Sequence, residues 1–298
     1  MTRLLITGMG GFTGKHVVDY VGGGEFEFFG IGQSEAPELR GRTTQYVADL
    51  YDLARVKAIV RDIKPDLVIH LAGTAFVARN DVEAFYKTNL VGSRNLLEAL
   101  DSLDHAPRGI LLASSANIYG NRCTGEISEQ VKADPANEYG VSKLAMELVA
   151  RIMSKSLPII ITRPFNYTGI GQSIDFLIPK IVDHLRRGAK RIKLGSLDVA
   201  RDFSDVRDVA RAYMELLLNP KAIGQTVNIC SGRAYKLREV MSIAQKLAGR
   251  SLEVQTDPAL VRSHEIDALW GNREKLSRLT EGHPFRPLSD TISWMLHG

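Results

Sequence analysis

The chain has 298 residues, of which 44% are hydrophobic and 24% are charged, and its net charge is +4. This composition is typical of a globular protein and excludes intrinsic disorder and coiled coil, while the length predicts about two structural lobes. The two cysteines, Cys123 and Cys230, are too few for a disulfide framework or a metal-ligand set. No apolar run approaches the roughly 20 residues of a membrane span, and the start leaves no room for a signal peptide. We therefore expect a cytoplasmic protein without a metal, whose slight basic excess indicates neither a nucleic-acid nor a membrane partner.

Short apolar runs alternate with amphipathic stretches along the first 165 residues. The apolar runs are residues 4–7, 26–31, 45–47, 67–72, 109–113 and 159–162. The amphipathic stretches include residues 53–63, 84–103 and 139–154. Runs that are apolar throughout are typical of parallel strands buried on both faces, so the pattern predicts an α/β fold of the Rossmann type, a doubly wound parallel sheet. Because such sheets bind ligands beyond the carboxyl ends of their strands, motifs at those ends carry the most weight.

The alternation becomes less regular after residue 165. We expect helices at residues 176–187, 206–218 and 237–248, and strands at residues 226–229 and 252–254. These elements predict a smaller C-terminal α/β lobe over residues 166–298, with some segments returning to the first lobe, residues 1–165. A basic stretch at residues 186–193 is interpreted as a helix end at Gly188, and the alternative is a patch for a phosphorylated ligand.

A glycine-rich turn directly follows the first predicted strand. Gly8, Gly11 and Gly14 have Gly-x-x-Gly-x-x-Gly spacing, and Gly10 and Phe12 lie within the same turn. Glycine permits the tight turn and the close approach of the backbone to a pyrophosphate, and the helix that follows presents free N–H groups to the phosphates. At this position the motif predicts a dinucleotide-binding site.

The end of the second predicted strand bears on the choice of dinucleotide. An NAD-binding sheet usually has an acid there for the ribose hydroxyls, but this chain has Gln33 and Ser34, and its nearest carboxylate is Glu35. Ser34, with Arg40 or Arg42 nearby, can hold a 2′-phosphate instead, so the sequence favours NADP(H), with NAD(H) as the alternative. Asp49, after the third strand, is either a contact of the adenine amino group or an ordinary turn aspartate.

A second motif, Tyr139-x-x-x-Lys143, opens the amphipathic stretch at residues 139–154. Residues four apart lie on one face of a helix, so the phenol and the ammonium share one space. We expect the Lys143 cation to stabilise a Tyr139 phenolate and to lower the phenol pKa toward neutrality. Ser115, at the end of the fifth strand, supplies a hydroxyl at the same edge of the sheet.

Together these motifs resemble the extended short-chain dehydrogenase/reductases that act on nucleotide sugars. The resemblance extends over nearly the whole chain and includes residues 70–73, 88–92, 163–166, 201–206 and 257–262. Within that family, residues 163–172, 201–208 and 257–265 most resemble the GDP-4-keto-6-deoxy-D-mannose reductases, which form GDP-D-rhamnose or GDP-6-deoxy-D-talose.

The resemblance implies a role for each matched residue. Tyr139 would protonate the sugar oxygen as a ketone is reduced, and Ser115 would polarise the carbonyl. Lys143 would lower the pKa of Tyr139 and hold the nicotinamide ribose, and Asn89 would steady the lysine. The cofactor-binding set, with the glycine turn, is completed by Ser34, Arg40, Asp49, Leu50, Leu71, Ala72, Gly73 and Pro164. The substrate-binding set is Ser115, Asn117, Asn166, Arg201, Arg262 and Glu265, with the arginines on the diphosphate. The resemblance also implies a homodimer formed through residues 84–103 and 139–154.

One departure from the family separates its possible reactions. Sugar-nucleotide 4,6-dehydratases have a glutamate where this chain has Asn117, and an amide cannot abstract a carbon-bound proton. Net reduction of a 4-keto-6-deoxyhexose, GDP-linked by resemblance, is therefore the leading prediction. The alternatives are an NAD-dependent 4-epimerase, a dTDP-4-keto-6-deoxyhexose reductase and, remotely, a non-catalytic NAD(P)-binding regulator. The first lobe would then bind NADP(H) and the second mainly the nucleotide sugar.

Overall fold

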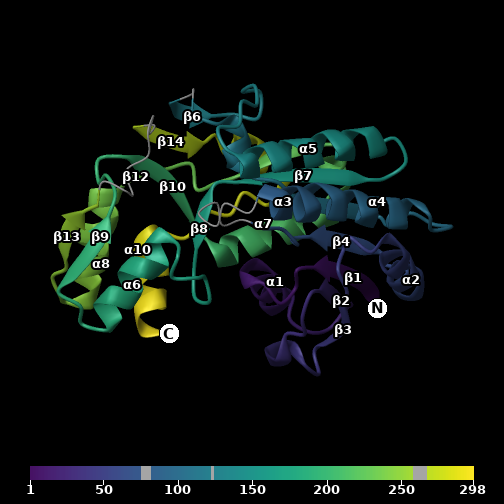
Figure 1. Ribbon diagram of the computed structural model, residues 1–298, viewed down its shortest axis with the longest axis horizontal. Coiled ribbons are helices and arrows are strands. Elements are labelled where there is room, and N and C mark those ends of the chain that lie inside the picture. The colour runs from purple at the N-terminus through teal and green to yellow at the C-terminus, as the bar shows by residue number, and fades with distance from the viewer. Residues whose placement is uncertain (75–81, 122–123, 258–266) are drawn as a thin grey trace.

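A computed structural model describes residues 1–74, 82–121, 124–257 and 267–298 of the chain. Its larger sheet has seven parallel strands in the order β11-β7-β5-β4-β1-β2-β3 (Figure 1). In chain order the strands are β1 (Thr2–Thr7), β2 (Phe26–Gly32), β3 (Thr43–Val47), β4 (Leu67–His70), β5 (Gly109–Ala113), β7 (Ile159–Pro164) and β11 (Thr226–Ile229). The predicted parallel Rossmann-type sheet is therefore confirmed.

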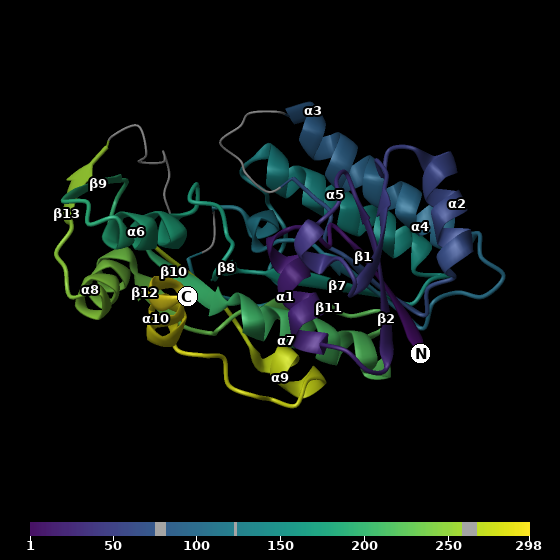
Figure 2. The same ribbon diagram turned by 90° about the horizontal axis from the view of Figure 1, so that it is seen from below.

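Helices cover both faces of this sheet, because its strands are apolar on both faces. Leu4 and Ile6 of β1 share one core with α1 (Phe12–Val21) and α7 (Val206–Leu218). Leu5, which points to the other face, shares a second core with helices α2 (Leu53–Ile63), α4 (Ser93–Asp101) and α5 (Glu138–Met153). In Figure 2, α4 and α5 lie above the larger sheet and α7 lies below it. The carboxyl ends of the strands remain uncovered by these layers, and that edge faces the second lobe.

The second lobe has its own sheets and core. Its larger sheet has the order β12-β10-β14-β6, with β8 paired to β10, and a two-stranded sheet joins β13 to β9. The strands are β6 (Gly125–Ile127), β8 (Asn166–Thr168), β9 (Arg191–Leu194), β10 (Ala200–Asp205), β12 (Ala234–Lys236), β13 (Glu253–Thr256) and β14 (Ala268–Gly271). Helices α6 (Leu177–Arg186), α8 (Leu237–Ala248) and α10 (Leu288–His297) bury an apolar cluster against them.

The chain crosses between the lobes several times. It leaves β10 in the second lobe, forms α7 and β11 in the first, and returns through β12. A further helix, α9 (Glu274–Leu279), packs against β11, and β6, from the first half of the chain, pairs with β14. These crossings explain why no linker composition marks a boundary at residue 165.

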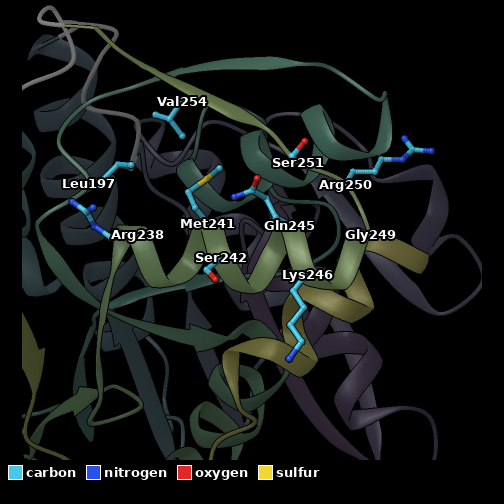
Figure 3. Close-up of a pocket in the computed structure, with 10 residues that line it drawn as sticks. All are labelled: Leu197, Arg238, Met241, Ser242, Gln245, Lys246, Gly249, Arg250, Ser251 and Val254. Carbon is cyan, nitrogen blue, oxygen red and sulfur yellow. The ribbon is translucent and has the colours of Figure 1, made fainter.

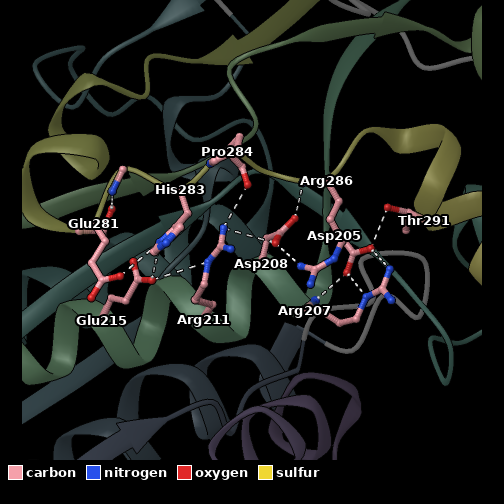
Figure 4. Close-up of polar contacts among 12 residues, drawn as sticks. Asp205, Arg207, Asp208, Arg211, Glu215, Glu281, His283, Pro284, Arg286 and Thr291 are labelled. Atoms are coloured by element: carbon pink, nitrogen blue, oxygen red, sulfur yellow. Dashed lines mark hydrogen bonds and ion pairs between the residues drawn. The ribbon is translucent and has the colours of Figure 1, made fainter.

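An ionic network fastens the C-terminal segment to α7 (Figure 4). The Asp205 carboxylate, fully buried, accepts two hydrogen bonds from the Arg207 guanidinium and one from the Thr291 hydroxyl. Asp208, also fully buried, forms one ion pair with Arg286 and one with Arg211. Because breaking a buried pair leaves an unpaired charge, this network holds α10 firmly against the start of α7.

The predicted helix over residues 84–103 is interrupted in the structure. A short helix α3 (Val82–Phe85) passes into a π-helical segment, η3 (Tyr86–Gly92), and only then into α4. Such π segments inside helices are frequent at functional sites. Three single-turn 3-10 helices, η1 (Pro37–Leu39), η4 (Ala116–Tyr119) and η5 (Pro220–Ala222), complete the described elements.

The basic stretch at residues 186–193 is a helix end, as interpreted from the sequence. Helix α6 ends at Arg186, Arg187 pairs with Asp183 one turn earlier, and Gly188 follows with a φ of +68°. Within the described residues, no helix is both long enough and apolar enough to cross a membrane.

Candidate active site

A cleft of about 580 Å³ lies where the carboxyl ends of β1, β4, β5 and β7 face the second lobe. The first lobe lines it with residues from the glycine turn, the ends of β4 and β5, and the start of α5. The second lobe lines it with residues of β8, β10 and the segment before α6. Thirteen of the residues proposed from the sequence line the cleft: Gly8, Gly11, Phe12, Gly14, Leu71, Gly73, Ser115, Asn117, Tyr139, Lys143, Pro164, Asn166 and Arg201.

The glycine turn brings the backbone close to the neighbouring strand. Gly8 has a φ of +70°, and a Cβ at this position would lie 2.8 Å from the backbone nitrogen of Ala72. Gly11 donates its N–H to the Gly8 carbonyl at 2.9 Å and caps α1, whose first N–H groups open toward the cleft. The turn thus has the two features that a pyrophosphate requires, an unobstructed backbone and a helix N-terminus.

Ser115, Tyr139 and Lys143 meet at the floor of the cleft. Asn137 accepts the N–H of Gly140 at 2.8 Å and so caps α5 at the turn that carries Tyr139. The Tyr139 phenol is hydrogen-bonded to Ser115, and the Lys143 ammonium donates to the Ala113 carbonyl at 2.8 Å. All three side chains are buried. The sequence motif thus becomes one hydrogen-bonded group at the carboxyl edge of β5.

Burial shifts the pKa of both titrating groups. Desolvation raises the pKa of Tyr139 to about 12 against a smaller lowering by the Ser115 hydrogen bond. Desolvation lowers the pKa of Lys143 to about 8, and the Glu147 carboxylate opposes this. The expected lowering of the phenol pKa toward neutrality is therefore wrong for this structure, because burial of the phenol outweighs the effects that lower its pKa. At neutral pH the site holds a protonated phenol beside an ammonium, the state that a proton donor needs.

Asn89 lies just behind the cleft wall, in η3. Its Oδ1 accepts the N–H of Thr74 at 2.9 Å, and its Nδ2 donates to the Ser142 hydroxyl at 3.0 Å. A Cβ added to Gly73 would lie 2.9 Å from Asn89 Oδ1 and 3.2 Å from Lys143 Nζ. The amide and the ammonium therefore border the same small space, which only glycine leaves open at residue 73.

Asn117 holds the hydroxyl oxygen of Ser115. Its backbone N–H and its Nδ2 both donate to Ser115 Oγ, each at 3.1 Å. Because these two donors occupy both lone pairs of Ser115 Oγ, the Ser115 hydroxyl can still donate its own proton to a third group. Asn166 donates to the Asp202 carbonyl, and Arg201 donates to the Ala200 carbonyl while lining the cleft.

Tyr167 of β8 is a cleft residue that the sequence reasoning missed. Its phenol is hydrogen-bonded to Thr13 of α1 at 2.8 Å, and its ring stacks on Phe12 with centroids 5.9 Å apart. The second lobe thus covers the start of α1. Tyr167 follows Asn166, which the resemblance singled out. This adjacency is the one signal in the sequence that could have indicated Tyr167 as a cleft residue. The cleft also takes in Thr74, Ser114, Asn121, Gln172, Ser173, Phe176 and Leu269.

The remaining proposed residues lie at the rim or outside the described chain. Ser34 is exposed, Arg40 pairs with Glu35 at 2.8 Å, and Arg42 pairs with Asp19 at 2.8 Å. Asp49 accepts the N–H of Tyr51, as a turn aspartate does. Leu50 and Ala72 lie behind the wall, and Gly10 is exposed. Arg262 and Glu265 lie outside the described residues, as does Cys123.

The described part of the cleft wall has a restricted chemistry. Its ionisable side chains are Tyr139, Tyr167, Lys143 and Arg201, and none of its described residues carries a carboxyl, an imidazole or a thiol. The wall can therefore donate protons and hold anions. Its described residues contain no carboxylate base for removing a carbon-bound proton.

A second hollow, of about 570 Å³, runs along α8 (Figure 3). Its cations already have partners, because Arg238 pairs with Asp198 and Arg250 donates to the Leu185 carbonyl. In Figure 3 the Lys246 side chain points away from the hollow. The cleft between the lobes is therefore the better candidate for the active site.

Comparisons with known proteins agree with this geometry. A family model described as GDP-mannose 4,6 dehydratase matches residues 5–290. GDP-6-deoxy-D-talose 4-dehydrogenase of Aggregatibacter actinomycetemcomitans is 33% identical, over 92% of this chain and 90% of its own length. GDP-6-deoxy-D-mannose reductase of Pseudomonas aeruginosa is 32% identical, over 95% of this chain and 92% of its own length.

Two solved structures are similar over almost the whole chain. A protein from Burkholderia cenocepacia J2315, described as a "putative epimerase", has a TM-score of 0.93 and 45% identity, covering 99% of this chain and 97% of that one. RMD from Pseudomonas aeruginosa, complexed with NADPH, has a TM-score of 0.85 and 30% identity, covering 99% and 98%.

The sheet, the glycine turn and the Ser115–Tyr139–Lys143 group define the fold and site of a short-chain dehydrogenase/reductase. The family model and the relatives show that the chain belongs to the GDP-mannose 4,6 dehydratase family. It is accordingly an NAD(P)-dependent enzyme of the nucleotide-sugar class, and the resemblance stated from the sequence is confirmed.

Proposed function

We propose that this protein reduces the 4-keto group of a nucleotide-linked 4-keto-6-deoxyhexose, GDP-4-keto-6-deoxy-D-mannose, with NADPH. The observation that carries the proposal is the composition of the described cleft wall, which combines a proton-donating Ser115–Tyr139–Lys143 group with a complete lack of carboxylates. A ketone needs a proton at its oxygen and a hydride at its carbon, whereas dehydration of a sugar also needs a base for a carbon-bound proton.

The first lobe fits the dinucleotide. Gly8 and Gly11 line the cleft at the N-terminus of α1, and Gly73 and Lys143 line it at the place proposed for the nicotinamide ribose. Ser34 lies just after β2 and Arg40 just after η1, both are exposed, and together they could hold a 2′-phosphate. The ion pair between Arg40 and Glu35 is exposed, so the phosphate could replace Glu35 as the partner of Arg40. This arrangement supports NADPH over NADH. The bound cofactor supplies the hydride.

The chain's own residues carry the proton. The Tyr139 hydroxyl donates to the sugar O4 as the alcohol forms, and the Ser115 hydroxyl donates a hydrogen bond to the same oxygen while charge develops on it. The Lys143 ammonium then faces the tyrosinate that remains and stabilises it. Asn166 and Arg201, together with Arg262 and Glu265, would hold the diphosphate and the sugar.

The choice of a GDP-linked keto sugar rests on the two curated relatives, whose names place both of them on GDP-6-deoxyhexoses. The similarity to an epimerase structure favours a second candidate, 4-epimerisation of a nucleotide hexose with tightly held NAD. Against that candidate stands the end of β2, where Gln33 and Ser34 replace the acid that usually holds the NAD ribose.

The test is to incubate the purified protein with NADPH and GDP-4-keto-6-deoxy-D-mannose while following NADPH absorbance and the sugar product. We expect one NADPH consumed per sugar and a 4-hydroxyl product. GDP-mannose, which has no ketone, should give no water loss, and release of a 4-keto product from it would contradict the argument from Asn117. Conversion of a UDP- or GDP-hexose into its 4-epimer without net NADPH loss would establish the second candidate. Reaction with dTDP-linked keto sugars alone would retain the chemistry but reject the GDP assignment.

The protein is further proposed to be a homodimer formed through residues 84–103 and residues 139–154, the second of which belong mostly to α5. Val141, Leu148 and Ile152 are exposed on this helix at spacings of seven and four residues, so they share one face. A second copy of the same helix would cover that apolar face. Sedimentation equilibrium should give the dimer mass, and Leu148→Glu should give the monomer mass. A monomeric wild-type protein would reject this interface.

A further inference from the structure

His70 is a buried imidazole that the reaction proposed above does not use. It ends β4, is 1% exposed, and lies between two hydroxyl groups. Its Nδ1 is 2.6 Å from Thr7 Oγ1 at the end of β1, and its Nε2 is 2.7 Å from Ser93 Oγ at the start of α4. It therefore joins two strand ends under the cofactor cleft to the helix that follows η3.

The partners of these hydroxyls determine where each proton lies. Ser93 donates its only hydroxyl proton to the Asn89 carbonyl at 2.6 Å, so His70 Nε2 must be the donor to Ser93. The Ala72 N–H is directed at Thr7 Oγ1 at 3.3 Å, and the Thr7 proton remains for His70 Nδ1. Burial and the nearby Lys143 cation lower the pKa of His70 to about 3, so the ring is neutral. The neutral Nε2–H tautomer satisfies every group.

The same direction of donation continues beyond Asn89. Its carboxamide donates from Nδ2 to Ser142 Oγ at 3.0 Å, and Ser142 donates to the Tyr139 carbonyl at 2.8 Å. Thr7, His70, Ser93, Asn89 and Ser142 are each at most 1% exposed, so water does not compete for these bonds. Two sets of hydrogen bonds thus meet at Asn89, whose backbone carbonyl accepts from Ser93 and whose side chain donates to Ser142. Through this residue they connect the carboxyl ends of β1 and β4 with the α5 turn that carries Tyr139 and Lys143.

We propose that His70 is a positioning residue: through Thr7 and Ser93 it fixes the η3 segment in the register that sets Asn89 against Lys143 and the Tyr139 turn. The register matters because an uninterrupted α-helix would place Asn89 on a different part of the helix surface. A buried imidazole serves here because it accepts on one side and donates on the other, as no apolar residue can. This inference rests on the proposed reduction, in which Asn89 supports Lys143.

The activity test compares substitutions that differ by one hydroxyl group. Thr7→Val and Ser93→Ala interrupt the hydrogen bonds of His70 and should lower kcat by about 10- to 100-fold with little change in the KM of the keto sugar, because the proton-donating group is misplaced rather than lost. Thr7→Ser keeps the hydroxyl and should retain kcat. Thr291→Val removes an equally buried hydroxyl that donates to Asp205 in the second lobe, and it should lower the melting temperature while keeping kcat. If Thr7→Val also keeps kcat, the positioning role is rejected.

A second readout does not depend on the sugar. In the spectrum of protein labelled with ¹⁵N-histidine, one imidazole should remain the neutral Nε2–H tautomer from pH 5 to pH 8. Its signal is assigned to His70 by its absence from the spectrum of His70→Gln, or by its shift in the spectrum of Thr7→Val. An Nδ1–H tautomer, or titration near pH 6.5, would overturn the inference. If the wild-type protein reduces no keto sugar, the proposed reaction fails while this spectrum still decides the state of His70. NADPH affinity then decides its positioning role: it should be weakened by Thr7→Val and retained by Thr7→Ser, and equal affinities would reject that role.

Discussion

The two lobes contribute to the cleft in different ways. The first lobe presents side chains from the ends of buried strands, and Ser115, Tyr139 and Lys143 are each less than one-tenth exposed and hydrogen-bonded to the framework. The second lobe presents residues that are more exposed: Asn166, Ser173 and Phe176 are exposed, and Tyr167, Gln172, Arg201 and Leu269 are partly exposed. Groups that move protons must be held within fractions of an ångström, whereas groups that grip a ligand can adjust to it. We therefore propose that the first lobe supplies the chemistry and that the second selects the substrate.

The largest expected effect tests this comparison with the two phenols in the cleft. Tyr139→Phe removes the proposed proton donor and should lower kcat by about 10²- to 10⁴-fold while NADPH binding is retained. Tyr167→Phe, in the second lobe, removes only the hydrogen bond to Thr13 and should change kcat far less. Steady-state kinetics and a fluorescence titration with NADPH measure both. Equal losses of kcat in the two variants would break the division between the lobes.

The pH dependence of kcat tests the electrostatics of the first lobe. Because desolvation lowers the pKa of Lys143 to about 8, its cation is present below that pH and is lost above it. The phenol, with a pKa of about 12, stays protonated over the same range. We expect kcat to be level from pH 6 to pH 7.5 and then to fall about tenfold for each pH unit above 8. A kcat that stays level up to pH 10 would exclude the Lys143 cation from the rate-determining step.

The sequence predicted the first lobe better than the second for a physical reason. Buried parallel strands such as β1 and β5 are apolar throughout, so their pattern survives without knowledge of their neighbours. Strands β6, β8 and β12 have three residues each and pair with distant segments, so no periodicity marks them. The η3 segment was missed because its helix-like pattern does not reveal the Ser93 hydrogen bond to Asn89. A motif at the start of a predicted helix identified Tyr139 and Lys143, whereas Tyr167 belongs to no motif and enters the cleft through tertiary packing.

A smaller effect is expected from the second lobe. Arg201→Ala should raise the KM of the nucleotide sugar about tenfold and change kcat less, because a diphosphate is held equally in the ground and transition states. Arg233→Ala is the matched control, since this exposed arginine pairs with Glu239 away from the cleft. Arg262→Ala is expected to act as Arg201→Ala does. A loss of kcat without a change in KM for Arg201→Ala would assign chemistry to the second lobe.

The smallest effect concerns the rim of the first lobe, where its side chains are as exposed as those of the second. Gln33→Asp would place a carboxylate beside the ribose, adding a hydrogen bond for NADH and repelling the 2′-phosphate of NADPH. Solvent screens this repulsion, so the ratio of kcat/KM for NADPH to that for NADH should fall by about tenfold or less. Gln33→Asn, which adds no charge, should leave the ratio unchanged. If the wild-type enzyme instead required NADH, Glu35 rather than Ser34 would govern the pocket, and its pair with Arg40 would have to open when the cofactor binds.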